Sequence, residues 1–240
     1  DGQVGLLVDG LPIGYLAPVS FGRLMRSPED RATDYLSASM LRILRYLALG
    51  VSLLLPGIYA AMAMFHQQML PTKLLLSIIE SKQDVPFSTL FEVVGLLCAF
   101  ELLQQAGLHL PQAIGTAVSI IGGLVVGTAA VDAKLVSPAA LIVTASSGIC
   151  GFTLPNRELS DALRLWRLGL TVLGGVFGLF GVTAGLLLLL VRLAGLESLE
   201  RSYLAPFGEA EVKGALVRER LTEQKWRDGT LRPLDERNQR

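Results

Sequence analysis

Long apolar runs without charge set the organisation of this chain. Four stretches of about 20 residues contain no Asp, Glu, Lys or Arg: residues 47–65, 113–131, 135–154 and 168–191. A helix that crosses a bilayer needs about 20 mostly apolar residues, because it rises about 1.5 Å per residue through a hydrocarbon core about 30 Å thick. The pattern predicts an all-α polytopic membrane protein with about four transmembrane helices.

A fifth apolar segment, residues 87–107, differs because it contains Glu92 and Glu101 and no cation. Nine helical steps of about 100° make about 900°, so the two carboxylates point to opposite sides of a straight helix. An ionised acid at bilayer depth costs about 2.5 kcal/mol or more. We therefore expect a re-entrant or amphipathic acidic helix, or one enclosed by other subunits. Both acids are candidates for a pore lining or a subunit interface.

Small residues recur at a spacing of four in two of the runs. Such spacing lets helix backbones approach closely in lipid. It predicts tight helix packing or homo-oligomerisation through three pairs of glycines: Gly123 and Gly127, Gly174 and Gly178, Gly181 and Gly185.

Three prolines are candidate hinges. Pro56 lies inside the run 47–65 and cannot donate a hydrogen bond to the carbonyl of Ser52. We expect a kink there, and we expect a neighbouring helix or water to satisfy that carbonyl. A packing kink and a gating hinge both remain open. Pro138 and Pro155 mark further breaks.

The flanking segments are polar. Turn signals between apolar residues predict a short β-hairpin within residues 1–22. We expect residues 1–39 to be the end of an N-terminally truncated cytoplasmic domain, 40–192 to be the transmembrane domain and 193–240 a polar tail, for which the resemblance described below implies a cytoplasmic location. Arginines between positions 23 and 45 favour a cytoplasmic location for the N-terminal end of the chain. The charges leave four and five crossings both possible.

The chemistry of the chain excludes several classes of protein. Lys and Arg total 21, as do Asp and Glu, so there is no net charge that would attract nucleic acid. Cys98 and Cys150 lie in apolar surroundings, and no spacing indicates a metal site or a disulfide framework. No catalytic motif is present, and His66 and His109 lie far apart. We expect no enzymatic activity, no cofactor and no metal. His66 is either a pH sensor or simply solvated.

Several phrases together resemble the A subunits of spore germinant receptors, the GerA spore germination protein family. They include "LLVDGLP" at 6–12, "LLPGIYAAMAMFH" at 54–66 and "FELLQQAGLHLPQAIGTAVSIIGGLVVGTAAVDAKLVSP" at 100–138. The similarity covers roughly residues 4–207. A sporulation-stage paralogue of the same family fits as well.

The resemblance implies a subunit in the inner spore membrane of an endospore-forming bacterium, with both ends cytoplasmic and an even number of crossings. It implies a transporter-like B subunit that binds the nutrient, a lipoprotein C subunit, and an oligomer that forms or gates a cation-conducting pore. A non-conducting membrane scaffold for other germination proteins is the alternative. A secondary transporter comes third, because the halves show no internal repeat. The nutrient and the oligomer number are not specified.

This chain departs from the family pattern near the membrane. Gln104 and Gln105 stand where the family has an arginine and a glutamate, His109 where arginine is usual, and Lys134 where glycine is usual. These changes bear on ion passage or partner docking. Glu92 and Glu101 align with family acids. We hypothesise that one carboxylate faces a water-filled cation path and the other anchors the helix against a neighbouring subunit. The alternative is a static helix interface.

Overall fold

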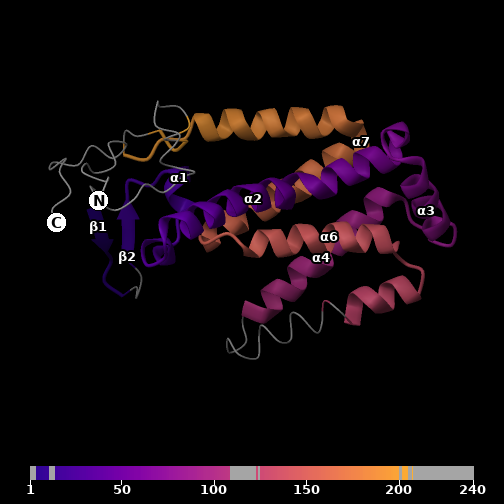
Figure 1. Cartoon of the computed structure of the whole chain (residues 1–240), viewed down its shortest axis with the longest axis horizontal. Coiled ribbons are helices and arrows are strands. Elements are labelled where there is room, and N and C mark those ends of the chain that lie inside the picture. The colour runs from indigo at the N-terminus through magenta and orange to yellow at the C-terminus, as the bar shows by residue number, and fades with distance from the viewer. Residues whose placement is uncertain are drawn as a thin grey trace. The chain divides into compact units, whose positions relative to one another are not determined.

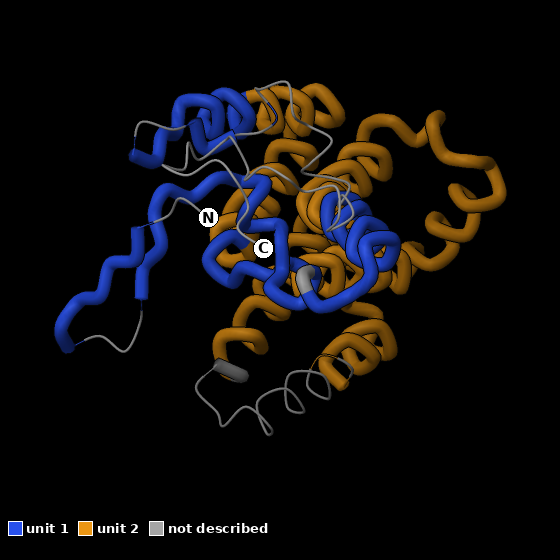
Figure 2. Tube along the Cα trace, turned by 60° about the vertical axis from the view of Figure 1, so that its left-hand side comes forward, with its two compact units in different colours: residues 1–47, 154–159, 188–240 blue, residues 48–153, 160–187 orange. Residues whose placement is uncertain are grey.

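The computed structural model describes residues 4–10, 14–108, 123, 125–199, 202–204 and 207. The chain divides into two compact units, coloured separately in Figure 2. Unit 1 comprises residues 1–47, 154–159 and 188–240, and unit 2 comprises 48–153 and 160–187. The domain boundaries expected from the sequence stay predictions.

Unit 1 begins with the hairpin that the sequence predicted. Strands β1 (Val4–Leu7) and β2 (Gly14–Ala17) pair antiparallel, with Val4 opposite Ala17 and Leu7 opposite Gly14. Helix α1 (Phe21–Leu24) and the 3₁₀ helix η1 (Pro28–Arg31) follow. Ser27 is the N-cap of η1 and Pro28 its first residue, because proline fits the first turn, where its missing N–H costs nothing.

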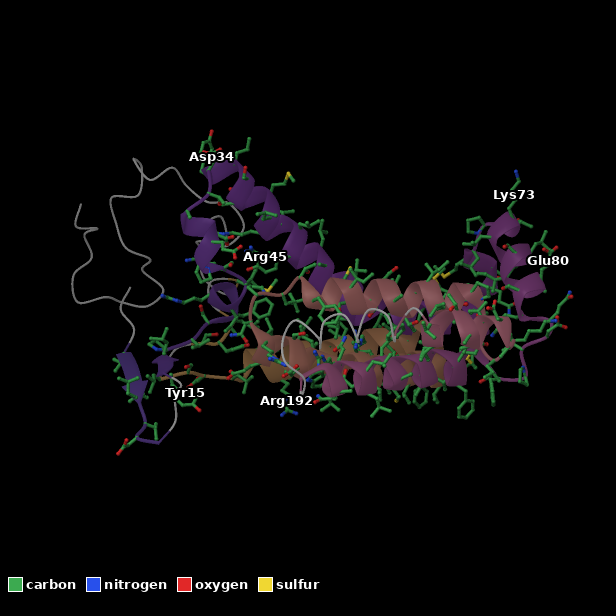
Figure 3. All side chains as sticks on the ribbon, turned by 90° about the horizontal axis from the view of Figure 1, so that it is seen from below. Tyr15, Asp34, Arg45, Lys73, Glu80 and Arg192 are labelled. Atoms are coloured by element: carbon green, nitrogen blue, oxygen red, sulfur yellow. The ribbon has the colours of Figure 1, made fainter. Side chains whose placement is uncertain are left out.

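Asp30 joins η1 to the start of α2 within unit 1. Its side chain is 1% exposed, and its Oδ2 accepts hydrogen bonds from Arg45 Nη1 at 2.8 Å, Ser27 N at 3.2 Å and Arg42 Nε at 3.3 Å; Arg45 is labelled in Figure 3. Burial alone would raise the pKa of Asp30, but these donors together hold it below its ordinary value of 3.8.

We expect unit 1 to lose stability in acid through Asp30. A carboxyl whose pKa is lowered by folding stabilises the fold above its unfolded value, and this contribution is lost as the pH falls through the folded value. Below about pH 4 we expect a loss of about 2 kcal/mol, since hydrogen bonds between charged groups are involved. The measurement is the unfolding midpoint against pH. Asp30→Asn should be less stable at neutral pH and lack this step; an unchanged acid profile would contradict the assignment.

Four aromatic rings form a second cluster in unit 1. Phe21, Tyr46, Tyr203 and Phe207 lie with ring centroids 5.7–6.3 Å apart. The backbone N–H of Phe21 also donates to the Tyr203 carbonyl at 2.7 Å. Burial raises the pKa of the Tyr203 hydroxyl, so it stays neutral at ordinary pH. The segment after α7 is therefore packed on the segment before α2.

Unit 2 is helical. Helix α2 (Tyr35–Met64) enters it and is followed by η2 (Gln67–Met69), α3 (Thr72–Lys82) and α4 (Thr89–Leu108). Residues 125–132 are helical, and α6 (Pro138–Phe152) and α7 (Arg157–Ala194) follow (Figure 1). Val93, Leu96 and Leu97 of α4 pack on Ala140 of α6, and this contact forms a buried core.

Within the residues that the structure describes, three helices are long and apolar enough to cross a membrane: α2, α4 and α7. Much of their apolar surface is exposed, including Phe91 at 70% and Phe180 at 77%. Lipid or protein partners would have to cover such surface. The predicted fold class is therefore confirmed in part: the described residues form a mostly helical fold with three long apolar helices, shorter helices and a hairpin. Helix α6 has 15 residues, and most of the predicted span 113–131 lies outside the described residues.

The acidic segment forms an unbroken helix. We expected a re-entrant or amphipathic helix, or one enclosed by other subunits. Helix α4 runs for 20 residues and has the length and composition of a span; which of these arrangements it adopts in a membrane stays a prediction. Each acid of α4 forms an ion pair with another element, which explains how this helix accommodates both of them.

The predicted single span 168–191 is wrong, because α7 bends back on itself at Gly178. This residue has φ 66° and ψ −153° inside the helix, a region open to glycine alone. The two limbs meet at the bend in Figure 1, and Gly181 and Gly185 face Leu173 and Leu170 of the first limb. The apolar run is therefore divided between the limbs of a helical hairpin.

Candidate functional site on the acidic helix

Glu92 lies in the first turn of α4, and its side chain is 0% exposed. Its Oε2 accepts two hydrogen bonds from Ser137, from the backbone N–H at 2.9 Å and from the hydroxyl at 2.8 Å. Its Oε1 lies 2.9 Å from Lys82 Nζ, at the end of α3. The buried carboxylate thus connects three elements, α3, α4 and α6.

The beginning of α6 explains why a carboxylate is stable there. Ser137 is the N-cap, its hydroxyl accepts from Ala140 N at 3.3 Å, and Pro138 is the first helical residue. Free N–H groups and the helix dipole make this end of a helix favourable for negative charge. Pro138, predicted as a hinge, begins α6, and its hinge role stays a prediction.

Lys82 supplies the cation that the apolar segment lacks. It belongs to the last turn of α3, and its Nζ also donates to Thr89 Oγ1 at 2.5 Å. A second lysine pairs close by: Lys134 Nζ lies 2.5 Å from Asp84 Oδ2, with both side chains exposed. Lys134 has φ 56°, a left-handed conformation that glycine adopts most easily. That conformation gives a physical reason for the glycine that the resemblance led us to expect there.

Glu101 has a different partner and is less buried. Arg164 Nη1 of α7 lies 2.9 Å from Glu101 Oε1 and 3.2 Å from Asp161 Oδ1. The Glu101 side chain is 33% exposed and that of Arg164 15%. One acid of α4 therefore contacts α3 and α6 and the other contacts α7, in agreement with the opposite orientations that their spacing predicts.

A third polar connection lies beneath Pro56. Ser147 Oγ of α6 donates to the Ser52 carbonyl at 2.7 Å, the carbonyl that the proline cannot satisfy. Arg167 of α7 is 5% exposed, and its Nη1 donates to Ser147 Oγ at 3.4 Å. The neighbouring-helix partner expected for Ser52 is thus Ser147. Helix α2 continues through Pro56, whose hinge role stays a prediction.

The predicted packing glycines lie at close contacts within unit 2. Gly174 faces the carbonyl of Gly57 in α2, and Gly57 faces the Leu170 carbonyl in return. Gly127 faces Leu141 of α6, and Gly123 faces Phe100 of α4. Pro155 lies between α6 and α7. A role for these residues between subunits stays a prediction. Gln104 lies in α4, whereas His109 falls outside the described residues.

In the part of the chain that the structure describes, no group of three His, Cys, Asp or Glu side chains is arranged to hold a metal ion. Cys98 and Cys150 are both free thiols. The chemical feature of this site is a set of ion pairs between apolar helices.

Apolar helices of this length, linked by charged pairs, define a mostly helical protein with candidate membrane spans. The chain belongs to the Bacillus/Clostridium GerA spore germination protein family, whose sequence profile matches residues 1–230.

Curated relatives agree with this assignment. Over 221 residues, 91% of this chain, it is 39% identical to spore germination protein KA and 38% identical to the uncharacterized membrane protein YfkQ, both of Bacillus subtilis. Over 89% of this chain, it is 36% identical to spore germination protein A1 of the same organism. The chain spans less than half of these relatives, 41–44% of each. No solved structure matches it.

Proposed function

We propose that this chain is the membrane region of a germinant receptor A subunit and acts in spore germination. Family membership and relatives that carry the name spore germination protein support the proposal. Helices α2, α4 and α7 suit a location in the inner spore membrane. By the same reasoning, a transporter-like B subunit and a lipoprotein C subunit are its partners.

Within that receptor, the chain oligomerises to form or gate a cation-conducting pore, and Glu101 is the acid that faces the path. The observation that favours Glu101 is the difference in exposure, 33% for its side chain against 0% for Glu92. A pore-lining carboxylate must reach water, and rings of acids select cations in channels. Glu92, enclosed by partners of its own chain, has the anchoring role.

The test compares Glu101→Gln with Glu92→Gln in purified oligomers reconstituted into liposomes, with the partner subunits present. We expect Glu101→Gln to assemble normally and to change the cation flux or its selectivity, because a carboxylate on the path is lost. Glu92→Gln should reduce the amount of assembled protein instead. Glu80→Gln, on the exposed face of α3 (Figure 3), is the matched control. If both variants assemble and conduct like the wild type, the assignment fails.

A non-conducting scaffold is the second candidate. It is favoured by the pairing of both acids with cations of the same chain, since static ion pairs between helices need no ion path. Oligomers that recruit the partner subunits and carry no flux under any germinant would support it.

A further inference from the structure

A cavity of about 420 Å³ lies in unit 2, at the end of α2 that leads into α3. It is bounded by α2, η2, α3 and the beginning of α4. Its volume is within the range of small-molecule sites, about 300–1,000 Å³. None of the functions proposed above uses this cavity.

The walls of the cavity are mainly apolar. Ala63 and Met64 of α2 form one side, and Leu75, Ile78 and Ile79 of α3 form another. Leu75 and Ile78 are three residues apart and Ile79 four from Leu75, so they share one face of α3. An aliphatic chain placed among these side chains would leave water for an apolar environment.

The polar end of the cavity contains Lys82 and Thr89. A lysine ammonium has three donors. Here Lys82 Nζ donates to Thr89 Oγ1 at 2.5 Å and forms an ion pair with Glu92 Oε1 at 2.9 Å. These two contacts engage at most two of the donors, so at least one remains for a molecule in the cavity. The Lys82 side chain is 21% exposed, so a molecule in the cavity can contact its ammonium group.

The charges around Lys82 favour an anion. The described residues that line the cavity include no Asp or Glu. Glu92 is sealed from solvent, and part of its charge is taken up by the two Ser137 donors at the N-terminus of α6. Lys82 is the one charged residue among the described residues that line the cavity, so an anionic head group would meet its ammonium and a cationic head group would be repelled.

We propose that this cavity binds a small aliphatic monocarboxylate, with its carboxylate on Lys82 Nζ and its chain between α2 and α3. A charge-assisted hydrogen bond at one end and an apolar wall along the rest match this chemical class. The site is independent of the pore proposal, because it needs neither an oligomer nor Glu101.

Octanoate is the probe. Octan-1-ol and octylammonium, which have the same chain length but a neutral and a cationic head group, are the comparison compounds. Binding is measured by calorimetry on the chain in phosphatidylcholine nanodiscs, with empty nanodiscs to subtract partition into lipid. We expect octanoate to bind at least about tenfold more tightly than either analogue, since only it offers a charged acceptor. Equal affinities for the three would overturn the proposal.

Two variants locate the site. Ala63→Phe places an aromatic ring in the cavity while both residues of the Lys82–Glu92 pair are kept, and it should abolish saturable octanoate binding. Lys82→Met should weaken it about tenfold, and Lys73→Gln, on the exposed face of α3, should leave it unchanged. Since Lys82→Met removes an ion pair and could unfold the chain, a diazirine-bearing octanoate mapped by mass spectrometry gives an answer without mutation. Crosslinks confined to residues outside the cavity lining, or full binding by Ala63→Phe, would refute the site.

Discussion

Replacing Glu92 by alanine is expected to lower the free energy of unfolding by about 3–5 kcal/mol, among the largest effects of any single change in this chain. Removing one partner of a buried ion pair leaves the other charge uncompensated. Here Lys82 would keep only Thr89, and both donors of Ser137 would lose their acceptor. Unsatisfied buried donors add to the cost.

Denaturant titration in detergent micelles measures this loss, with helicity as the signal. Glu92→Gln should lose less, because an amide oxygen still accepts from Ser137. Glu80→Gln, at an exposed position of α3, should stay within about 0.5 kcal/mol of the wild type.

The double variant Lys82→Met with Glu92→Leu sharpens this test. Replacing both charges by apolar groups removes the penalty of an unpaired ion, so the double change should cost less than the sum of the single changes. Strict additivity would show that Lys82 and Glu92 do not interact and would contradict the observed pairing.

Gly178→Ala is expected to cost about 2–3 kcal/mol and to disrupt the α7 hairpin. An L-residue is strained at φ 66° and ψ −153°. The added Cβ would also meet the imidazole of His66, at 2.9 Å from its Cε1. The second limb, which begins after Gly178, should then separate from the first.

Gly169→Ala is the matched control, in the same helix but with open space at the position of an added Cβ. It should be neutral or stabilising by up to about 1 kcal/mol, because alanine favours helix over glycine. Hydrogen exchange over residues 179–191, compared between the two variants, reports the hairpin directly. If Gly178→Ala is as stable and as well protected from hydrogen exchange as Gly169→Ala, the hairpin does not require the positive φ of residue 178.

Local sequence determined much of the secondary structure. The hairpin at residues 4–17 and the Ser27–Pro28 start of η1 follow from turn and cap residues that act over a few positions. Long apolar runs predicted apolar helices, because backbone hydrogen bonds in lipid have to be satisfied within the segment. The nine-residue spacing predicted that the acids of α4 point to different neighbours.

Only the tertiary structure decided which neighbours these are. Ser137 and Arg164 lie 45 and 63 positions from the acids that they contact, and no periodicity links residues so far apart. The apolar segment 87–107 contains two acids and no cation of its own. The cations that pair with them, Lys82 and Arg164, belong to other helices that tertiary packing brings next to α4.

The same limit applies to the bend in α7. Gly169, Gly174, Gly175, Gly178, Gly181 and Gly185 all lie within or beside the apolar run, and each lowers helix propensity by a similar amount. Sequence alone therefore determined that this run could bend. The tertiary structure places the turn at Gly178, where Gly174 approaches α2 closely and Gly181 and Gly185 approach the first limb, because residues without a side chain let the backbones come this near.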